Sequence, residues 1–479
     1  MKKKFFESFN TRSFRLGSYS FVLTAIVLAI VVAVNLLVNA LPDRLTHYDI
    51  SSAKIFTFTS YTKAVVTRLN EDVTINWIVQ AGEEDEILGT LLDKYEKLND
   101  HVKVVKKNPD IYPAFASQYT NENIHNNDLI VVCGDRSRHV RITDIYMSDT
   151  SETLEGGKEN VNFDGEGQVT SAINYVTRDT YPIVYYTTGH EELEFTQSLL
   201  ASMTKSNYEL RPLSLIAVDS IPEDGDMVLI NSPQVDFTDY ERELIEEYII
   251  NGGSVMMFSG LPVNGSLDNI YELCWRFGFD KQPGVVIESE RSRYAYGQPY
   301  SILPIMNAGD ITDPLIEESR QVIMPISQGM VKREEMADNY LITEMLTTGE
   351  DSSYSKLAGY NLEVFDEEDG DIDGPFCLSA LIDIKDSNGK LCIVSSDYIC
   401  DDEFNANSAG ANMDFIINAF NYLIGDYEYI TIRATTVKTE TLTISQTEGT
   451  VLKIAMLGVI PVAFLLSGLL ELIKRRKKD

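Results

Sequence analysis

The chain contains 479 residues, of which 44% are hydrophobic and 24% are charged. This composition excludes a disordered or collagen-like protein, and the length favours two folded domains over one. The 73 acidic residues outnumber the 40 basic residues and give a formal net charge of −33, which argues against nucleic acid as the main partner.

Two uncharged apolar segments lie near the two ends of the chain, at 21–38 and 454–470. Each is close to the length that crosses the hydrocarbon core of a bilayer as a helix. The sequence therefore predicts transmembrane helices over 18–41 and 451–472. A cleaved signal peptide is the alternative for the first segment, and a buried core helix is the alternative for the second.

Basic residues flank both apolar segments. Residues 1–40 contain five basic residues and one acidic residue, and residues 451–479 contain six basic and two acidic residues. Because positively charged flanks stay on the cytoplasmic side of a membrane, the N-terminus 1–17 and the tail 473–479 are predicted to be cytoplasmic. The body between the two helices is then extracytoplasmic, and it is more acidic than the chain as a whole.

A first α/β domain is predicted over 42–146. Apolar side chains alternate in its expected strands and recur every three or four residues in its expected helices. The helices are expected at 60–69 and 88–98, and the strands at 73–79, 101–107, 128–133 and 138–142. This succession is compatible with a small thioredoxin-like sheet, although the chain contains no CxxC motif. Polar and glycine residues predict a linker over 147–162.

A second α/β domain is predicted over 163–426, beginning with a helix at 166–176. Further on, strands alternate with helices, which implies parallel βαβ units. The strands are expected at 182–187, 226–231, 254–258, 376–384 and 391–395, and the helices at 195–205, 239–250 and 409–424. Thr238 is expected to cap the helix that follows it. The pattern weakens over 260–375, which we interpret as an insertion, and 427–450 is predicted to be an extended stalk.

The five cysteines do not suggest a disulfide framework, because their number is odd and two of them are isolated. A hairpin in which Lys385 faces Lys390 would place Cys392 opposite Asp383, too far from Cys377 to form a bond. We therefore expect most of the cysteines to be small buried hydrophobic residues.

Nucleotide-binding and hydrolase motifs (GxGxxG, GxxxxGK[ST], HExxH, GxSxG) are absent, which argues against an ATPase. His190, with Glu192 or Glu194, follows a predicted strand and could bind a ligand or a metal or act as acid and base. The alternative is that these side chains hydrogen-bond the turn and the helix start. Ser232 follows the strand at 226–231 and is either a nucleophile or a turn residue.

Two acidic clusters are candidate cation sites. Asp369, Asp371 and Asp373 have the spacing of the first half of a calcium loop, but Ala380 occupies the twelfth position, where an acid is required. A solvated acidic turn is the alternative there. Asp397 follows another predicted strand and either belongs to a binding site or lies in a charged loop.

Several short strings resemble the GldG-like auxiliary components of ABC transporters. FDGEGQVTSAI at 163–173 is similar to a helix start of that family, F-x-GE-x-x-(I/V)-T-x-A-(I/L), and GHEE at 189–192 is similar to its GHGE turn. Residues 396–397 and 412–418 resemble its closing segment. The likeness is collinear from about residue 45 to the end. The positions that the family motifs mark as structural are Gly165, Glu166, Thr170, Gly189, Asn412 and Asn418.

The resemblance implies a membrane-anchored, non-catalytic bacterial subunit, without a cofactor, that accompanies an ABC-2-type permease and a separate cytoplasmic ATPase. Some relatives serve gliding motility or surface export. The implied fold is a thioredoxin-like domain followed by an amidotransferase- or flavodoxin-like α/β domain. Two other hypotheses stay open: an anchored module that binds a ligand or a cation, and a surface hydrolase that uses His190, Glu192 and Asp397.

Overall fold

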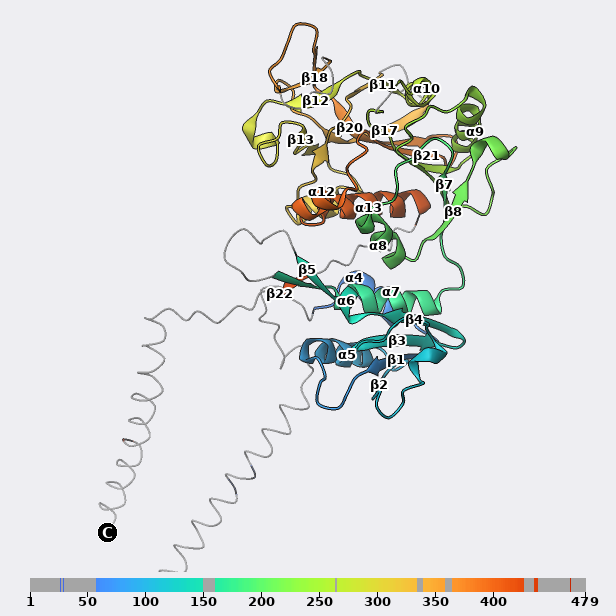
Figure 1. Cartoon of the computed structure of the whole chain (residues 1–479), viewed down its shortest axis with the longest axis vertical. Helices are drawn as coiled ribbons and strands as arrows, with labels where there is room; N and C mark the ends of the chain where they lie inside the picture. Colours follow the sequence, from blue (N-terminus) through green and yellow to red (C-terminus); the bar gives the residue numbers. More distant parts are fainter. Residues whose placement is uncertain are drawn as a thin grey trace, which may run out of the picture.

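The computed structural model describes residues 57–149, 160–262, 265–333, 339–357, 364–425 and 435–437, with the isolated positions 26, 29 and 466. Apart from those three positions, the predicted transmembrane helices at 18–41 and 451–472 and their basic flanks lie outside the described residues. Within the described part of the chain, no helix combines the length and the apolarity needed to cross a bilayer. Figure 1 shows two α/β bodies, one above the other.

The first body is built on a four-stranded sheet with the order β2-β1-β3-β4. Strand β1 runs parallel to β2 and antiparallel to β3, and β4 runs antiparallel to β3. The elements are α4 (Ser60–Thr67), β1 (Val73–Ile78), α5 (Glu86–Leu98), β2 (Val102–Lys107), the 3-10 helix η1 (Ala116–Gln118), β3 (Asp128–Cys133), β4 (Arg136–Val140) and α6 (Ile142–Ile145). The ends of the predicted elements differ from these by two residues or fewer.

Helix α5 illustrates how the sequence specifies this body. The side chain of Asp85 accepts a hydrogen bond from Leu88 N at 2.7 Å and so caps the helix. Leu88, Leu91, Leu92 and Tyr95 recur at helical spacing and are all fully buried against the sheet.

Helix α7 (Gly165–Thr177) packs in the core of the first body, whereas its sequence pattern predicted it at the start of the second domain. Its side chains at Val169, Ala172, Ile173 and Val176 are buried in the same core as the leucines of α5. A Cβ at Gly165 would lie 2.4 Å from the Phe163 ring and 2.7 Å from Leu91, so the missing side chain permits this close approach. The first body therefore ends after α7.

A small sheet joins segments that are far apart in the sequence. It contains β5 (Tyr146–Asp149), β6 (Asn160–Phe163) and β22 (Thr435–Val437), with β6 in the middle. The predicted linker at 147–162 therefore has a strand at each end, and its middle lies outside the described residues. Of the predicted stalk at 427–450, the structure describes only β22, which is extended.

The second body contains a ten-stranded sheet. Strands β8, β7, β9, β10 and β21 are parallel neighbours in that order, and β20 continues the sheet antiparallel to β21. These strands are β7 (Ile183–Thr187), β8 (Glu209–Leu213), β9 (Met227–Asn231), β10 (Ser254–Phe258), β20 (Cys377–Ile384) and β21 (Lys390–Val394). Beyond β20 lie β11 (Phe279–Lys281), β14 (Ile305–Met306), β16 (Met330–Lys332) and β17 (Tyr340–Thr347).

Helices cover both faces of this sheet. Alternate side chains of its buried strands point to opposite faces and pack in two separate hydrophobic cores. In β10, Met256 and Phe258 belong to one core, and Val255 and Met257 belong to the other. The first core is shared with α8 (Gln197–Lys205) and α13 (Ala411–Ile424), which lie on the side of the first body in Figure 1, next to α12 (Asp402–Asn407). The second core is shared with α9 (Asp239–Ile250) and α10 (Asp268–Arg276).

The region 260–375, predicted as an insertion, is only partly separate. Its strands β11, β14, β16 and β17 extend the main sheet, because β17 pairs with the long strand β20. The rest forms small sheets and short helices. They are β12 (Val285–Glu288), η3 (Arg291–Arg293), β13 (Ser301–Ile302), α11 (Asp313–Glu317), β15 (Met324–Pro325), β18 (Ser353–Lys356) and β19 (Ile372–Asp373). An earlier 3-10 helix, η2 (Leu215–Ala217), follows β8.

All five cysteines lie in described residues, and each is free and buried, as predicted. The predicted register of the β20–β21 hairpin is wrong: Lys390 faces Asp383, and Cys392 faces Leu381. The loop between the strands is therefore longer by two residues on the β20 side than the sequence analysis assumed.

The two bodies meet where α7 packs against α8. Lys205 Nζ lies 2.8 Å from both carboxylate oxygens of Asp164, which is 2% exposed. Ser171 Oγ donates to the Lys205 carbonyl oxygen, and Asn207 Nδ2 donates to the Ser171 carbonyl oxygen. Burial raises the pKa of Asp164 and outweighs the opposing effect of Lys205. This polar contact holds α7 in place at the junction.

We expect Lys205→Met to destabilise the protein by about 3 kcal/mol, because it leaves a buried carboxyl group without its partner. Lys106→Met is the control, since Lys106 pairs with Glu84 at the surface and its loss should cost less than about 1 kcal/mol. Urea denaturation of the three purified proteins measures both values. Equal effects of the two substitutions would contradict a role for Lys205 in joining the bodies.

Candidate functional site

The candidate site lies at the carboxyl edge of the parallel strands of the second body. From β7 the chain passes to β8 on one side, and β9, β10 and β21 then follow on the other side. The direction of winding thus changes between β7 and β9. In open α/β sheets, ligands bind in the crevice at such a switch point.

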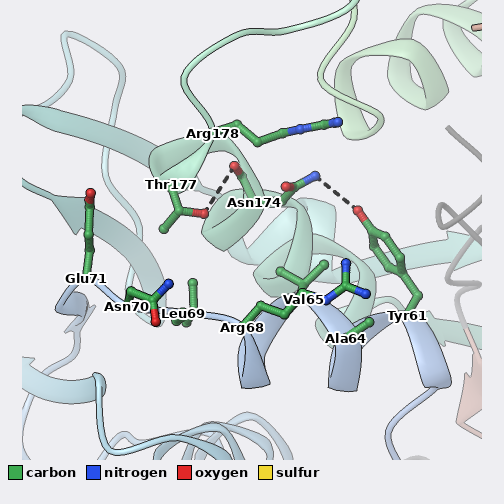
Figure 2. A pocket seen from close by; sticks show the side chains of 10 residues that line it. All are labelled: Tyr61, Ala64, Val65, Arg68, Leu69, Asn70, Glu71, Asn174, Thr177 and Arg178. Atoms are coloured by element: carbon green, nitrogen blue, oxygen red, sulfur yellow. Dashed lines mark hydrogen bonds between the residues drawn. The ribbon is translucent and has the colours of Figure 1, made fainter.

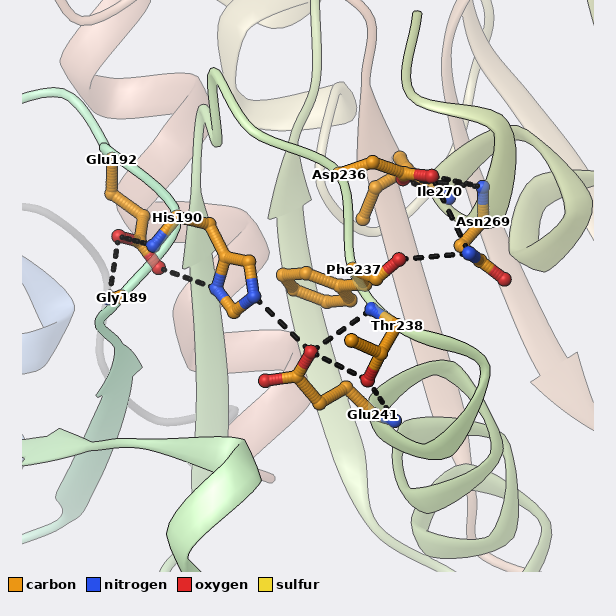
Figure 3. A network of polar contacts seen from close by, with 9 residues as sticks. All are labelled: Gly189, His190, Glu192, Asp236, Phe237, Thr238, Glu241, Asn269 and Ile270. Carbon is orange, nitrogen blue, oxygen red and sulfur yellow. Dashed lines mark hydrogen bonds and ion pairs between the residues drawn. The ribbon is translucent and has the colours of Figure 1, made fainter.

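His190 lies at this switch point, in the loop after β7 (Figure 3). Its Nε2 is 3.2 Å from Glu241 Oε2, and its Nδ1 is 3.6 Å from Glu192 Oε1. The other oxygen of Glu192 accepts hydrogen bonds from the backbone N–H groups of Gly189 and His190. Glu191, which stands where the resembled family has glycine, has a φ of +52°, in the left-handed region that glycine favours.

Glu241 links this loop to the start of α9. Its Oε2 accepts hydrogen bonds from Thr238 N at 2.9 Å and Thr238 Oγ1 at 2.8 Å, and Thr238 caps the helix as predicted. The two residues form a reciprocal capping box. The Phe237 and His190 rings pack edge to face, with their centroids 4.6 Å apart. The carboxylate of Asp236 accepts hydrogen bonds from the backbone N–H groups of Asn269 and Ile270, at the start of α10 (Figure 3).

The electrostatics favour a charged His190 between two carboxylates. The adjacent carboxylate of Glu192 raises the pKa of His190 against the effect of burial, and Glu241 adds to the increase. Burial opposes ionisation of Glu192, but the His190 side chain and hydrogen bonds from the backbone lower its pKa to about 2. Burial likewise opposes ionisation of Glu241, yet hydrogen bonds from Thr238 and the charge of His190 lower its pKa.

This geometry favours the structural alternative for His190 and Glu192. His190 is 8% exposed, and each ring nitrogen faces a carboxylate, so neither is directed at a site for a substrate or a metal. In the described ranges, no group of three or more His, Cys, Asp or Glu residues could hold a metal ion. Glu194 lies in the same loop before α8.

Asp397 belongs to a different network, at the ends of β10 and β21. Its Oδ1 accepts a hydrogen bond from Gly260 N at 2.7 Å, and the Ser232 side chain lies near its carboxyl group. Burial raises the pKa of Asp397. Nearby, the buried Lys281 donates to the Ser259 carbonyl oxygen and, at 3.1 Å, to Ser259 Oγ. Burial lowers the pKa of Lys281.

Ser232 has a φ of +53° directly after β9, and it is 1% exposed. Its backbone N–H donates to the Phe258 carbonyl oxygen, and its side chain lies near the Asp397 carboxyl group. The imidazole of His190 is engaged by Glu192 and Glu241, so it is not placed to act as the base for a nucleophilic serine. These contacts favour the turn interpretation of Ser232.

The three aspartates of the calcium-like string do not form a metal site. Asp371 accepts hydrogen bonds from the backbone N–H groups of Leu357 and Glu368 and lies 3.6 Å from Lys356 Nζ. Asp373 is in β19, and Asp369 is in the turn before it. The cation that Asp371 contacts is therefore a lysine, and the acidic-turn interpretation fits better.

The family-motif residues of the first body bind helices to one another. Glu166 Oε1 accepts hydrogen bonds from Thr59 N at 2.7 Å and Thr59 Oγ1 at 2.8 Å. Thr170 Oγ1 lies 2.9 Å from Thr62 Oγ1 and 2.6 Å from Tyr95 OH. The start of α7 thereby holds the start of α4 and the middle of α5.

The family-motif residues of α13 bind backbone from the region that the sequence left unassigned. Asn412 is fully buried; its amide exchanges hydrogen bonds with both Ile323 N and Ile323 O, and it donates to Ile399 O. Asn418 Nδ2 donates to Ile311 O at 3.2 Å. The remaining motif position is Gly189. Its φ of +118° is a backbone conformation that glycine adopts more readily than other residues.

The charge on His190 predicts a pH-dependent stability. Its contribution is complete below the unfolded-state pKa of about 6.5 and is lost as the pH rises through the raised folded-state pKa. The difference in free energy of unfolding between wild type and His190→Gln should therefore shrink from about pH 6 to about pH 9. Urea denaturation at intervals over this range measures it. The pKa of His139 is also raised, by Asp128 and Glu122 against burial, but His139 is present in both proteins and cancels. A difference that is constant with pH would contradict a charged His190.

Asn412→Ala should destabilise the protein by about 3 kcal/mol, because it leaves buried backbone groups of Ile323 and Ile399 unpaired. Asn418→Ala, in the same helix but half-buried, should cost about 1 kcal/mol. Urea denaturation distinguishes the two values. A smaller effect for Asn412 than for Asn418 would contradict this assignment.

Comparison with known proteins gives one family match. Residues 181–273 match the family model described as an ABC-type uncharacterized transport system. No curated protein matches the chain.

The chain is similar to several solved structures at low identity, including three named below. The mmIFT52 N-terminal domain is 16% identical, with 50% of this chain and 96% of that chain covered and a TM-score of 0.37. The exo-beta-1,4-mannosidase Op5Man5 from Opitutaceae bacterium strain TAV5 is 9% identical, with coverages of 70% and 48% and a TM-score of 0.28. PurLQS from Thermotoga maritima is 8% identical, with coverages of 51% and 100% and a TM-score of 0.24. Likenesses at these TM-scores support no argument.

The family match, which runs from just before β7 into α10, supports an auxiliary component of an ABC transport system.

Proposed function

We propose that the chain is a GldG-like, membrane-anchored, non-catalytic auxiliary subunit of an ABC-2-type transporter. The observation on which this rests is the match of residues 181–273 to an ABC-transport family model. In this proposal the subunit works with a separate permease and a cytoplasmic ATPase. Its two anchors are the apolar segments at 18–41 and 451–472, and its α/β bodies lie outside the cytoplasmic membrane.

The contacts at the switch point support the non-catalytic part of the proposal. The matched segment includes β7, β9, the loop that holds His190 and the first turn of α9, which holds Glu241. In that crevice His190 Nε2 lies 3.2 Å from Glu241 Oε2, and Glu241 caps α9 together with Thr238. An enzyme needs at least one ionisable group directed at a substrate.

The fold assignments form part of the same proposal. The mixed four-stranded sheet with flanking helices supports a thioredoxin-like first body, and the parallel order β8-β7-β9-β10-β21 supports a flavodoxin- or amidotransferase-like second body.

The described segments around Thr59 and Thr435, which lead towards the predicted anchors, support anchoring through the first body. On one side, Thr59 hydrogen-bonds Glu166, and on the other, Thr435 of β22 pairs with Phe163 of β6. Phe163 and Glu166 are three residues apart, so both segments that lead towards the predicted anchors leave the body at one place.

Affinity purification of the full chain in a mild detergent tests this function. We expect a multi-span permease and an ABC ATPase to be recovered with it and to be identified by mass spectrometry. A variant with 451–472 replaced by an unrelated transmembrane helix should stay in the membrane and recover less permease, because helix packing depends on the side chains at the contact.

An unrelated two-pass protein with the same tag is the control. Repeated recovery of the chain alone, under conditions that keep a known transporter complex intact, would contradict the proposed function.

A further inference from the structure

The first body has a pocket at the carboxyl ends of its two parallel strands, where Ile78 ends β1 and Lys107 ends β2. A smaller pocket of about 350 Å³ lies between α4 and the last turn of α7, where Asn174 Nδ2 donates to Tyr61 OH at 3.0 Å (Figure 2). That volume is at the lower end of the range for small-molecule sites, whereas the pocket at the strand ends has about 660 Å³ and lies well within the range. The larger pocket is therefore the better candidate for a ligand.

The loop 108–127, which joins β2 to β3, forms most of this larger pocket. Apart from η1, the described chain has no helix or strand between these two positions. Irregular connections longer than roughly 12–15 residues are uncommon in compact domains and often carry a function. Both ends of the loop are fixed to the sheet, because Val79 N donates to Lys107 O at 3.1 Å and Asn127 N donates to Ile78 O at 2.8 Å.

Two aromatic rings, those of Tyr112 and Phe115, line one part of the pocket. Lys107 Nζ lies 5.5 Å from the centroid of the Tyr112 ring and 4.9 Å from that of the Phe115 ring. These cation–π contacts help to hold the rings in place. Tyr112 is nevertheless 55% exposed, so much of its ring surface is open to a ligand.

Polar groups with unused hydrogen-bonding capacity line the rest of the pocket. In the described part of the chain, the ammonium group of Lys107 has no hydrogen-bond or ion-pair partner, and the side-chain amide of Asn121 has none either. Asp110 accepts hydrogen bonds from Gln80 Nε2 at 3.1 and 3.3 Å, and its two carboxylate oxygens can accept more. The pocket thus offers a ligand both donors and acceptors.

The charges of the lining favour a neutral ligand. Lys107 and His125 are basic, and Asp110 and Glu122 are acidic, so neither sign predominates. The carboxylate of Glu122 is also 3.0 Å from His139 Nδ1. An apolar ligand would separate the polar groups of the lining from water without replacing their hydrogen bonds, which costs free energy. A neutral ligand that donates and accepts hydrogen bonds suits this lining best.

We propose that this pocket binds a carbohydrate of one or two sugar units. Each sugar hydroxyl donates and accepts hydrogen bonds, as the mixed lining around Lys107, Asp110 and Asn121 requires. A sugar ring also has a face of C–H groups, and the exposed ring of Tyr112 provides an apolar surface for that face. The site goes beyond the proposed transport function and does not depend on it.

The test uses the full chain in a polyoxyethylene detergent, because maltoside detergents carry a sugar head group that would compete. The probes are cellobiose, maltose and diacetylchitobiose, each titrated into the protein in a calorimeter. Sorbitol at equal concentration is the reference, since polyols stabilise proteins by exclusion from their surface. We expect at least one of the three disaccharides to bind saturably and sorbitol not to bind.

Matched substitutions locate the site. Tyr112→Ala should weaken binding by about fivefold or more, because it removes the exposed ring, whereas Tyr112→Phe should bind nearly as the wild type does. Ile111→Ala is its control, since Ile111 is 66% exposed and outside the lining. Asn121→Ala should weaken binding by about threefold or more, as expected for one neutral hydrogen bond. Asn123→Ala, an exposed position outside the lining, should leave the affinity unchanged.

Unfolding curves without sugar show whether each variant is folded. The proposal is overturned if none of the three disaccharides binds above the sorbitol reference, or if folded Tyr112→Ala and Asn121→Ala bind as tightly as the wild type. Tyr112→Ala should still recover the permease in the affinity purification, so that a failure of sugar binding and a failure of the proposed transport function are separate results.

Discussion

One carboxylate oxygen, Oε2 of Glu241, determines the arrangement of the switch point. It accepts hydrogen bonds from the backbone and the hydroxyl of Thr238 and from the ring of His190. The start of α9 and the loop after β7 are therefore linked through one buried group, which together with Glu192 also favours the charged form of His190. The crevice where an open α/β sheet usually receives a ligand thus contributes to folding instead.

Much of the fold follows from local patterns in the sequence. The strands β7, β9 and β10 are short apolar runs, and Thr238 with Glu241 has the spacing of a capping box, so these elements were predictable. Strand β8 was not predicted, because it contains Pro212 and two charged residues. Such residues are tolerated there since β8 lies at the edge of the sheet.

Other features depend on contacts between distant residues, which no local pattern reports. Helix α7 was assigned to the wrong body because its apolar face is equally compatible with either sheet; the packing of Gly165 on Leu91 decides. The sequence placed His190 and Glu192 together but did not reveal that Glu241 completes the network. The burial of Lys281, the last residue of β11, was not predicted, since a lysine side chain is normally exposed. Asp397 was expected near His190 and instead accepts a hydrogen bond from Gly260 N.

The five buried, unpaired cysteines have a consequence for biogenesis. Where the pKa of these thiols is displaced, burial raises it, as for Cys133 and Cys274, whose pKa values rise to about 11. The reactive thiolate is therefore scarce in the native state, and exchange with other disulfides is suppressed. No bond in this set has to form for the two bodies to reach their native packing. Maturation can thus proceed equally in reducing and oxidising surroundings, without an oxidase or an isomerase.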